Sequence, residues 1–307
     1  MKLLPKILVS SVVRGAQQGD SHGGLYLVDP NQQSFDQVLD WNSCEINFEG
    51  RGADRGLRGI SFHDDRIYIA ASDELFVFNP RFEIVCSYRN PYLKHCHEIW
   101  KHGPNLYLTS TGFDSVLVFN LPAARFVSGI YIFPYGSGIG AKAFDPNGPS
   151  GPPPSIGFHF NNVFVDQRGV FVSGRKLKSL LCIRASEISV VARLPFGTHN
   201  ARPFNDGVLF NDTASDALRW LSSIRRVSLS LPSYPISQLS NVNKDDSKLA
   251  RQAFGRGLCT LSDTLIAGGS SPTTISLYDL EAEKIIRSIN ISMDVRNAVH
   301  GLAIWPY

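Results

Sequence analysis

The sequence of 307 residues predicts an all-β protein, a six-bladed β-propeller with four antiparallel strands in each blade. A short motif with a polar first residue recurs six times along the chain. Each of its first five copies is followed by a turn and then by short apolar strands. The last copy lies at the C-terminus, where it supplies a strand that the first unit lacks. The six copies are Arg58-Gly59-Ile60, His97-Glu98-Ile99, Asn161-Asn162-Val163, His199-Asn200-Ala201, Arg256-Gly257-Leu258 and His300-Gly301-Leu302.

The unit over residues 58–88 shows the repeat most clearly. Four short apolar strands are predicted in it, separated by turn residues such as Asp, Asn and Pro. Four such strands in succession are typical of one propeller blade. The same order of strands and turns predicts blades at residues 97–133, 161–194, 199–231 and 256–291.

The first unit, residues 6–41, lacks an opening strand, because the chain begins at the second-strand position with Ile7-Leu8-Val9. The missing strand is predicted at residues 300–305. Its pairing with the N-terminal strand would complete the first blade and cover strand edges that would otherwise be exposed. The sequence therefore predicts a single propeller domain over residues 1–307, with one short helix at 245–253.

Four long segments interrupt the short turns, and in a propeller they would belong to the face where the inner strands begin. Segments of this length in a compact domain are typical of functional lids or of disordered chain. We therefore expect the six polar motif residues to form a ring beneath them. The long segments are residues 13–23, 41–57, 135–158 and 232–254.

Composition excludes several classes of function. The net charge is only +3 and no basic run is present, so no nucleic-acid partner is expected. The apolar stretch Ile7 to Val13 is too short to span a membrane, so no membrane partner is expected. Five scattered cysteines without CxxC spacing predict reduced thiols and a cytoplasmic location. The sequence does not predict the oligomeric state.

Histidines occupy the motif position on alternate blades, at His97, His199 and His300. Three converging imidazoles are suited to acid–base catalysis, and they are equally suited to holding a divalent metal ion. Both alternatives stay open, as does a third in which each histidine merely bonds a neighbouring carbonyl in a wet channel. The cofactor is unknown, with a histidine-bound metal ion as the candidate.

Arginines at the motif position predict an anionic substrate. Arg58 and Arg256 have guanidinium groups that match a carboxylate or a phosphate. Asn161 is a further substrate-binding candidate, and His159, two residues earlier, could enter the channel in its place. Arg175 follows a predicted second strand on the same face and joins this set.

Two carboxylates are the best placed to act as a base or to orient a histidine. Glu98 directly follows a motif histidine, and Asp212 ends a predicted second strand. The alternative for Asp212 is that Asn211-Asp212-Thr213 is simply a turn into the next strand. The sequence contains no Walker loop, HExxH, GxSxG or paired CxxC signature.

The blade pattern resembles the broad six-bladed β-propeller superfamily that includes NHL-type, gluconolactonase-like and streptogramin-lyase-like proteins. Arg256-Gly257-Leu258, followed by Ala267-Gly268-Gly269-Ser270, is also similar to a motif of uncharacterised bacterial propeller proteins. The resemblance implies the fold over the whole chain and transfers no catalytic residues. The acidic metal-binding set of the gluconolactonase-like enzymes is not recognisable in this sequence.

Two functions follow as hypotheses. The first is an enzyme of the lyase, isomerase or hydrolase type, acting on a small anionic metabolite in the central funnel by histidine acid–base or metal-assisted chemistry. The alternative is a non-catalytic propeller that binds a protein or glycan partner through its long-loop face.

Overall fold

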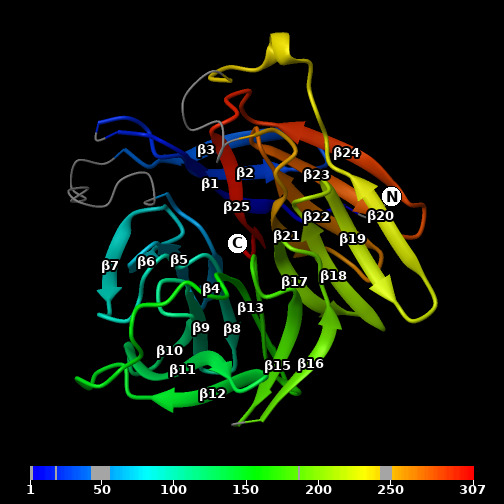
Figure 1. The fold of residues 1–307 in the computed structure, drawn as a ribbon. Helices are drawn as coiled ribbons and strands as arrows, with labels where there is room; N and C mark the ends of the chain where they lie inside the picture. Colours follow the sequence, from blue (N-terminus) through cyan, green and yellow to red (C-terminus); the bar gives the residue numbers. More distant parts are fainter. Residues whose placement is uncertain (1–2, 18, 43–55, 186, 243–250) are drawn as a thin grey trace. The chain divides into compact units, whose positions relative to one another are not determined.

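The computed structural model describes residues 3–17, 19–42, 56–185, 187–242 and 251–307 (Figure 1). Within these residues the strands β1 to β25 form six sheets, and all pairings between named strands that the structure gives are antiparallel. The sheets correspond in order to the six predicted blades. The fold class is therefore the predicted one, an all-β six-bladed β-propeller.

The chain forms two compact units, Gly59–Arg202 and a unit made of Met1–Arg58 with Pro203–Tyr307. The unit Gly59–Arg202 contains three sheets, with strand orders β4-β5-β6-β7, β12-β11-β10-β9-β8 and β13-β14-β15-β16. Their bounds are β4 Ile60–His63, β5 Arg66–Ala71, β6 Glu74–Phe78, β7 Ile84–Arg89, β8 Ile99–His102, β9 Asn105–Ser110, β10 Ser115–Asn120, β11 Arg125–Tyr135, β12 Gly138–Phe144, β13 Phe160–Asp166, β14 Gly169–Gly174, β15 Ser179–Arg184 and β16 Glu187–Arg193.

The remaining sheets have the orders β25-β1-β2-β3, β17-β18-β19-β20 and β21-β22-β23-β24. The strand β17, Thr198–Phe204, contains the passage of the chain from one unit to the other. The other bounds are β1 Ile7–Val13, β2 Gly24–Asp29, β3 Ser34–Asp40, β18 Gly207–Asp212, β19 Ala217–Ser222, β20 Arg226–Ser230, β21 Arg256–Thr260, β22 Leu265–Ser270, β23 Thr274–Asp279, β24 Lys284–Asn290 and β25 Asn297–Ile304.

Apolar side chains of neighbouring blades form the core of each unit. In Gly59–Arg202, Phe119 is fully buried and its ring lies 4.7 Å from that of Tyr88, on the preceding blade. The indole of Trp100 donates a hydrogen bond of 3.0 Å to the Val165 carbonyl and so links β8 to β13. The alternation of apolar and polar residues in these strands has thus predicted the packing between blades.

The other unit is built by the same rule. Val9 of β1 and Val299 of β25 pack in one cluster with Leu277 of β23. A second cluster joins Trp220 of β19 to Tyr278 of β23. Each cluster again joins the facing side chains of adjacent sheets.

The C-terminal strand completes the first blade, as predicted. β25 pairs with β1 along its length, with Leu8 opposite Ala303 and Val13 opposite Asn297. The strand begins at Asn297, earlier than the expected residue 300. Figure 1 shows β25 beside β1.

One predicted loop contains a strand. Residues 138–144, expected to lie in the loop 135–158, form β12, which pairs with β11 and gives that blade a fifth strand. The turn between them uses Gly136 with a φ of +56°, a conformation that favours glycine. The glycine-rich sequence concealed the strand, because it has little apolar alternation and most of its residues are partly exposed.

The linker before the last blade is described only in part. Most of the helix expected at residues 245–253 lies outside the described residues, which omit 243–250. Its last three residues, 251–253, are not helical. A 3₁₀ helix, η2, occurs earlier at Ile236–Gln238. No helix among the described residues is long and apolar enough to cross a membrane.

Candidate functional site

Five predicted site residues come together in the unit Gly59–Arg202, and we call them the histidine group. They share a position at or near the ends of the inner strands β8, β13 and β17 or of the neighbouring strand β14. The histidine group consists of His97, His159, Asn161, Arg175 and His199.

His97 and His159 form the accessible part of the group. Their ring centroids lie 5.7 Å apart with an interplanar angle of 62°, and both side chains are half-buried. His159 has a φ of +54°, in the left-handed region that few residues other than glycine adopt. The two rings therefore lie edge to face where solvent reaches them.

The backbone of Arg175 joins His159 to His199. Its N–H donates to the His159 carbonyl at 3.1 Å, and its carbonyl accepts a hydrogen bond from the Gly197 N–H at 2.9 Å. Nδ1 of His199 lies 2.9 Å from the Gly197 carbonyl. The Arg175 side chain is exposed and its guanidinium carbon lies 5.6 Å from the centre of the Phe196 ring. The backbone of Arg175 thus lies between the two histidine segments, and its charged group lies at the surface beside Phe196.

Asn161 and His159 have different positions. Asn161 is only 3% exposed, and its amide donates to the Thr198 carbonyl at 2.9 Å, which ties β13 to β17. The strand pairing shifts register between Phe160 and Asn162, so Asn161 occupies a β-bulge. The side chain in contact with the His97 ring is that of the half-buried His159. Asn161 instead bonds the Thr198 carbonyl.

The hydrogen bonds of His97 determine its neutral tautomer. Nδ1 lies 2.7 Å from the His95 carbonyl and 3.1 Å from the Thr111 hydroxyl. A carbonyl can only accept, so Nδ1 carries the proton and the lone pair of the neutral ring is on Nε2. The same argument applies to His199, which is 3% exposed and whose Nδ1 faces the Gly197 carbonyl.

The end of β9 and the residues after it hold the histidines in place. The Thr109 hydroxyl accepts hydrogen bonds of 3.0 Å from the N–H groups of His97 and Glu98. The Thr111 hydroxyl donates to the Phe160 carbonyl while it accepts from His97. One turn of the third blade thereby fixes both the His97 ring and the start of β13.

Asp114, in the same turn, anchors the segment that ends in His159. Its carboxylate accepts from the Ser155 hydroxyl at 2.6 Å and from the backbone N–H groups of Gly157 at 2.6 Å and His159 at 3.0 Å. The side chain is 1% exposed. Burial raises the pKa of Asp114, and these hydrogen bonds oppose the rise. This residue was not predicted, because an aspartate in a turn is common and nothing in the sequence distinguishes a buried one.

Glu98 lies beside the group and links β8 to β17. The Asn200 amide donates to its carboxylate at 2.9 Å, and the Ile99 N–H donates at 3.3 Å. Burial raises the pKa of Glu98 to about 7, against the attraction of the Arg202 guanidinium. A carboxyl with this pKa exchanges its proton near neutral pH.

A cavity of about 430 Å³ lies in the same unit, but none of the predicted site residues lines it. Its wall is formed by the last residue of β7 and the loop after it, together with one residue of the β5–β6 turn. The lining residues are Asp73, Arg89, Asn90, Pro91, Leu93 and Lys94. The contacts among the histidines, rather than this cavity, define the candidate site.

The other predicted residues lie in the second unit. Nη1 of Arg256 is 3.0 Å from Nε2 of His300, so the imidazole accepts from the guanidinium there. His300 itself occupies the bulge where the register of β1 and β25 shifts. The carbonyl of Arg58, which is 4% exposed, accepts from the Ser10 hydroxyl at 2.5 Å, and Ser10 accepts in turn from the Gly301 N–H.

Asp212 has a partner away from the histidines. Its carboxylate lies 2.9 Å from Nε of Arg219 and accepts from the Ser215 N–H at 3.3 Å, while only 2% of the side chain is exposed. These contacts match the turn that the sequence offered as the alternative to a catalytic role.

A metal site was the other predicted use of the histidines. Among the described residues, no group of three or more His, Cys, Asp or Glu side chains is arranged to hold a metal ion. His97 and His199 belong to one compact unit and His300 to the other. A single metal ion bound by all three histidines stays a prediction.

Comparison with known proteins identifies the fold. No family model and no curated protein sequence matches the chain. Among solved structures, the chain is similar to one in a nidogen/laminin complex, with a TM-score of 0.60, 10% identity and 97% of both chains covered. It is also similar to a protein of unknown function from Bacteroides caccae, with a TM-score of 0.59, 11% identity and coverage of 97% of this chain and 98% of the other.

A catalytically inactive virginiamycin B lyase from Staphylococcus aureus, solved with quinupristin, matches with a TM-score of 0.48 and 12% identity, over 80% of this chain and 73% of that one. At these identities the likeness shows the fold alone. The chain has the fold of a six-bladed β-propeller. No substrate follows from this likeness.

Proposed function

We propose that this protein is an enzyme that performs acid–base chemistry on a small anionic metabolite, with His97 and His159 as the proton-exchanging pair. The observation that carries the proposal is the edge-to-face contact of these two half-buried rings at 5.7 Å, with Nδ1 of His97 held by a carbonyl. Two imidazoles at this distance can give and take protons on one small molecule near neutral pH.

The proposal gives the two histidines different roles. Neutral His97 would accept a proton at Nε2, because its Nδ1 already donates to His95. In an elimination, that proton leaves the carbon next to a carboxylate, its bonding electrons form the new double bond, and protonated His159 gives a proton to the leaving group. Isomerisation and hydrolysis use the same pair in the same two roles.

Arg175 supplies recognition of the anion in this proposal. Its exposed guanidinium lies over Phe196, and a planar guanidinium binds a carboxylate or a phosphate with two parallel hydrogen bonds. The buried members, Asn161 and His199, support the strands that carry the accessible ones. Asp114 and Thr111 are positioning residues, since each acts through a histidine.

The test is conversion of small carboxylates and phosphate esters, followed by NMR, by the wild-type protein and by the variants His97→Ala and His159→Ala. Loss of a positioned acid or base lowers kcat about 10²- to 10⁴-fold. His102→Ala is the matched control, because His102 is an exposed histidine at the end of β8 and should leave the rate unchanged. Wild-type rates in both active-site variants would contradict the proposal and favour a non-catalytic propeller that binds a protein or glycan.

A further inference from the structure

Two consecutive cations lie beside the segment that carries His159. Arg175 and Lys176 belong to the turn between β14 and β15, and both side chains are exposed. The Arg175 N–H donates to the His159 carbonyl, and the Lys176 N–H donates to the Phe158 carbonyl, each at 3.1 Å. Backbone hydrogen bonds thus place both cations next to the histidine group.

The two side chains have different neighbours. Nζ of Lys176 donates to the Ile156 carbonyl at 3.2 Å, whereas the guanidinium carbon of Arg175 lies 5.6 Å from the centre of the Phe196 ring. One charged group therefore lies by the segment before β13 and the other by the segment before β17. A single anionic group bound at Arg175 leaves Lys176 for a second one.

The backbone around both cations is held on each side. The Leu177 N–H donates to the Gly174 carbonyl at 3.1 Å and closes the turn. On the facing segment, the Asp114 carboxylate accepts from the Ser155 hydroxyl and from the Gly157 N–H, both at 2.6 Å. The cations are thereby carried by backbone that is fixed relative to His159, as a binding site requires.

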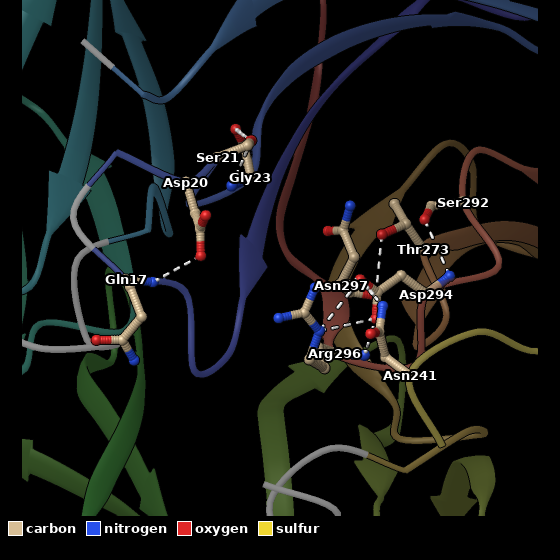
Figure 2. A network of polar contacts seen from close by, with 10 residues as sticks. All are labelled: Gln17, Asp20, Ser21, Gly23, Asn241, Thr273, Ser292, Asp294, Arg296 and Asn297. Carbon is tan, nitrogen blue, oxygen red and sulfur yellow. Dashed lines mark hydrogen bonds and ion pairs between the residues drawn. The ribbon is translucent and has the colours of Figure 1, made fainter. Parts of the chain in front are cut away.

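Figure 2 shows, by contrast, an arginine whose charge is answered by a carboxylate. Arg296 donates to Asp294 at 2.7 Å, and the Asn241 amide donates to the same carboxylate at 2.8 Å. Arg175 and Lys176 form no ion pair with any carboxylate in the part of the chain that the structure describes. Both charges are therefore available to an anionic ligand. The guanidinium offers a planar fork of donors, and the ammonium acts as a compact point charge.

An exposed apolar side chain accompanies each cation. Phe196, beside Arg175, is 48% exposed, and Ile156, beside Lys176, is 53% exposed. A ligand with an apolar chain would bury surface of these side chains that the free protein exposes to water. The surroundings of the two cations thus favour a ligand that is charged at its ends and apolar between them.

We propose that the substrate of the histidine group is a dianion whose two charged groups are joined by an apolar chain. Arg175 binds one charged group and Lys176 binds the other. The proposal rests on the function proposed above and adds Lys176 as the residue that selects substrates with a second charge.

The experiment is calorimetric titration of the full chain with dicarboxylates of increasing length, from succinate to suberate. Each is compared with the monocarboxylate that has the same number of carbons. We expect at least one dicarboxylate to bind about tenfold more tightly than its monocarboxylate, and affinity to rise with chain length. Lys176→Gln should abolish the preference for two charges and leave the binding of monocarboxylates unchanged.

The matched control is Lys178→Gln, because Lys178 is an exposed lysine two residues further along the same segment. It should keep the preference of the wild-type protein. Arg175→Gln should weaken the binding of both kinds of acid, since both use the guanidinium. Thermal unfolding verifies that each variant is folded.

Three results would overturn the proposal. The first is that no dicarboxylate binds more tightly than its monocarboxylate at concentrations up to about 10 mM. The second is that Lys176→Gln keeps the preference as fully as Lys178→Gln does. The third is that affinity does not rise from succinate to suberate, which would exclude the apolar chain.

These failures are distinguishable from failure of the proposed function. If His97→Ala and His159→Ala turn over substrate at the wild-type rate, the acid–base roles are wrong, whatever the titrations show. If the histidine variants lose turnover but Lys176→Gln keeps the preference, the acid–base roles stand and the second charge is not read by Lys176.

Discussion

His97 and His300 occupy the same position of the repeat, yet their surroundings give them opposite roles. Nδ1 of His97 donates to a backbone carbonyl, which leaves the lone pair of the neutral ring on Nε2. His300 instead accepts a hydrogen bond from Arg256, so the acceptor lone pair of its neutral ring is engaged by a guanidinium. The repeat therefore determines where each histidine lies in its blade. Its hydrogen-bond partners are determined by the neighbouring residues, which differ between blades.

The largest effect is expected at Asp114. Asp114→Ala removes the acceptor for the segment before β13 and leaves several backbone N–H groups without it. We expect the free energy of unfolding to fall by about 3 kcal/mol, and turnover to fall with it. Urea unfolding measures the first quantity. A loss below about 0.5 kcal/mol would mean that Asp114 does not hold His159 in place.

Thr111→Val should have the next largest effect. The valine cannot accept from Nδ1 of His97 or donate to the Phe160 carbonyl. We expect kcat to fall about tenfold with KM nearly unchanged, because the ring loses its orientation and the anion site does not. Thr111→Ser, which restores the hydroxyl, should recover most of the rate. Failure of serine to do so would show that Thr111 acts by packing alone.

Glu98 predicts a dependence of stability on pH. Burial raises its pKa from 4.5 to about 7, so the folded state holds the proton more tightly than the unfolded state does. The free energy of unfolding therefore falls as the pH rises from about 4.5 to 7 and is constant with respect to this group above that range. Glu98→Gln, which cannot ionise, should lack this loss.

Thermal unfolding at several pH values measures this effect. The Tm of the wild-type protein relative to that of Glu98→Gln should decrease between about pH 5 and pH 7. A difference that stays constant over this range would contradict the raised pKa. The nearby Arg202 is retained in both proteins and does not titrate in this range.

The smallest effect is expected from Arg256→Lys. Lysine keeps the charge but lacks the planar guanidinium, so the hydrogen bond to His300 should be weakened. The proposal gives Arg256 no part in the proton transfer, so turnover should not change. A large loss of turnover would contradict this and support the single six-residue ring that the sequence predicted.

The repeat predicted the fold closely because a blade is a local structure. Alternating apolar residues and short turns predict each strand, and the missing opening strand predicted the pairing of β25 with β1. Strand β12 escaped prediction, since its glycine-rich sequence has little alternation and its stability comes from pairing with β11.

The candidate site was predictable only in part. The motif positions found His97, His199 and Asn161, because the start of an inner strand is fixed by the repeat. The choice between His159 and Asn161 depends on the bulge at residue 161, which the sequence does not mark. Asp114 could not be found at all, because its role arises from contacts between segments far apart in the chain.

The most direct test of the central claim is the protonation of the histidine rings, measured by long-range ¹H–¹⁵N correlation NMR at about pH 8, where unperturbed imidazoles are neutral. Signals are assigned with the variants His97→Gln, His199→Gln and, as the exposed reference, His102→Gln. We expect His97 and His199 to carry their proton on Nδ1, with Nε2 unprotonated. A His97 ring protonated on Nε2 would contradict the proposal, because the nitrogen proposed to accept the proton would already hold one.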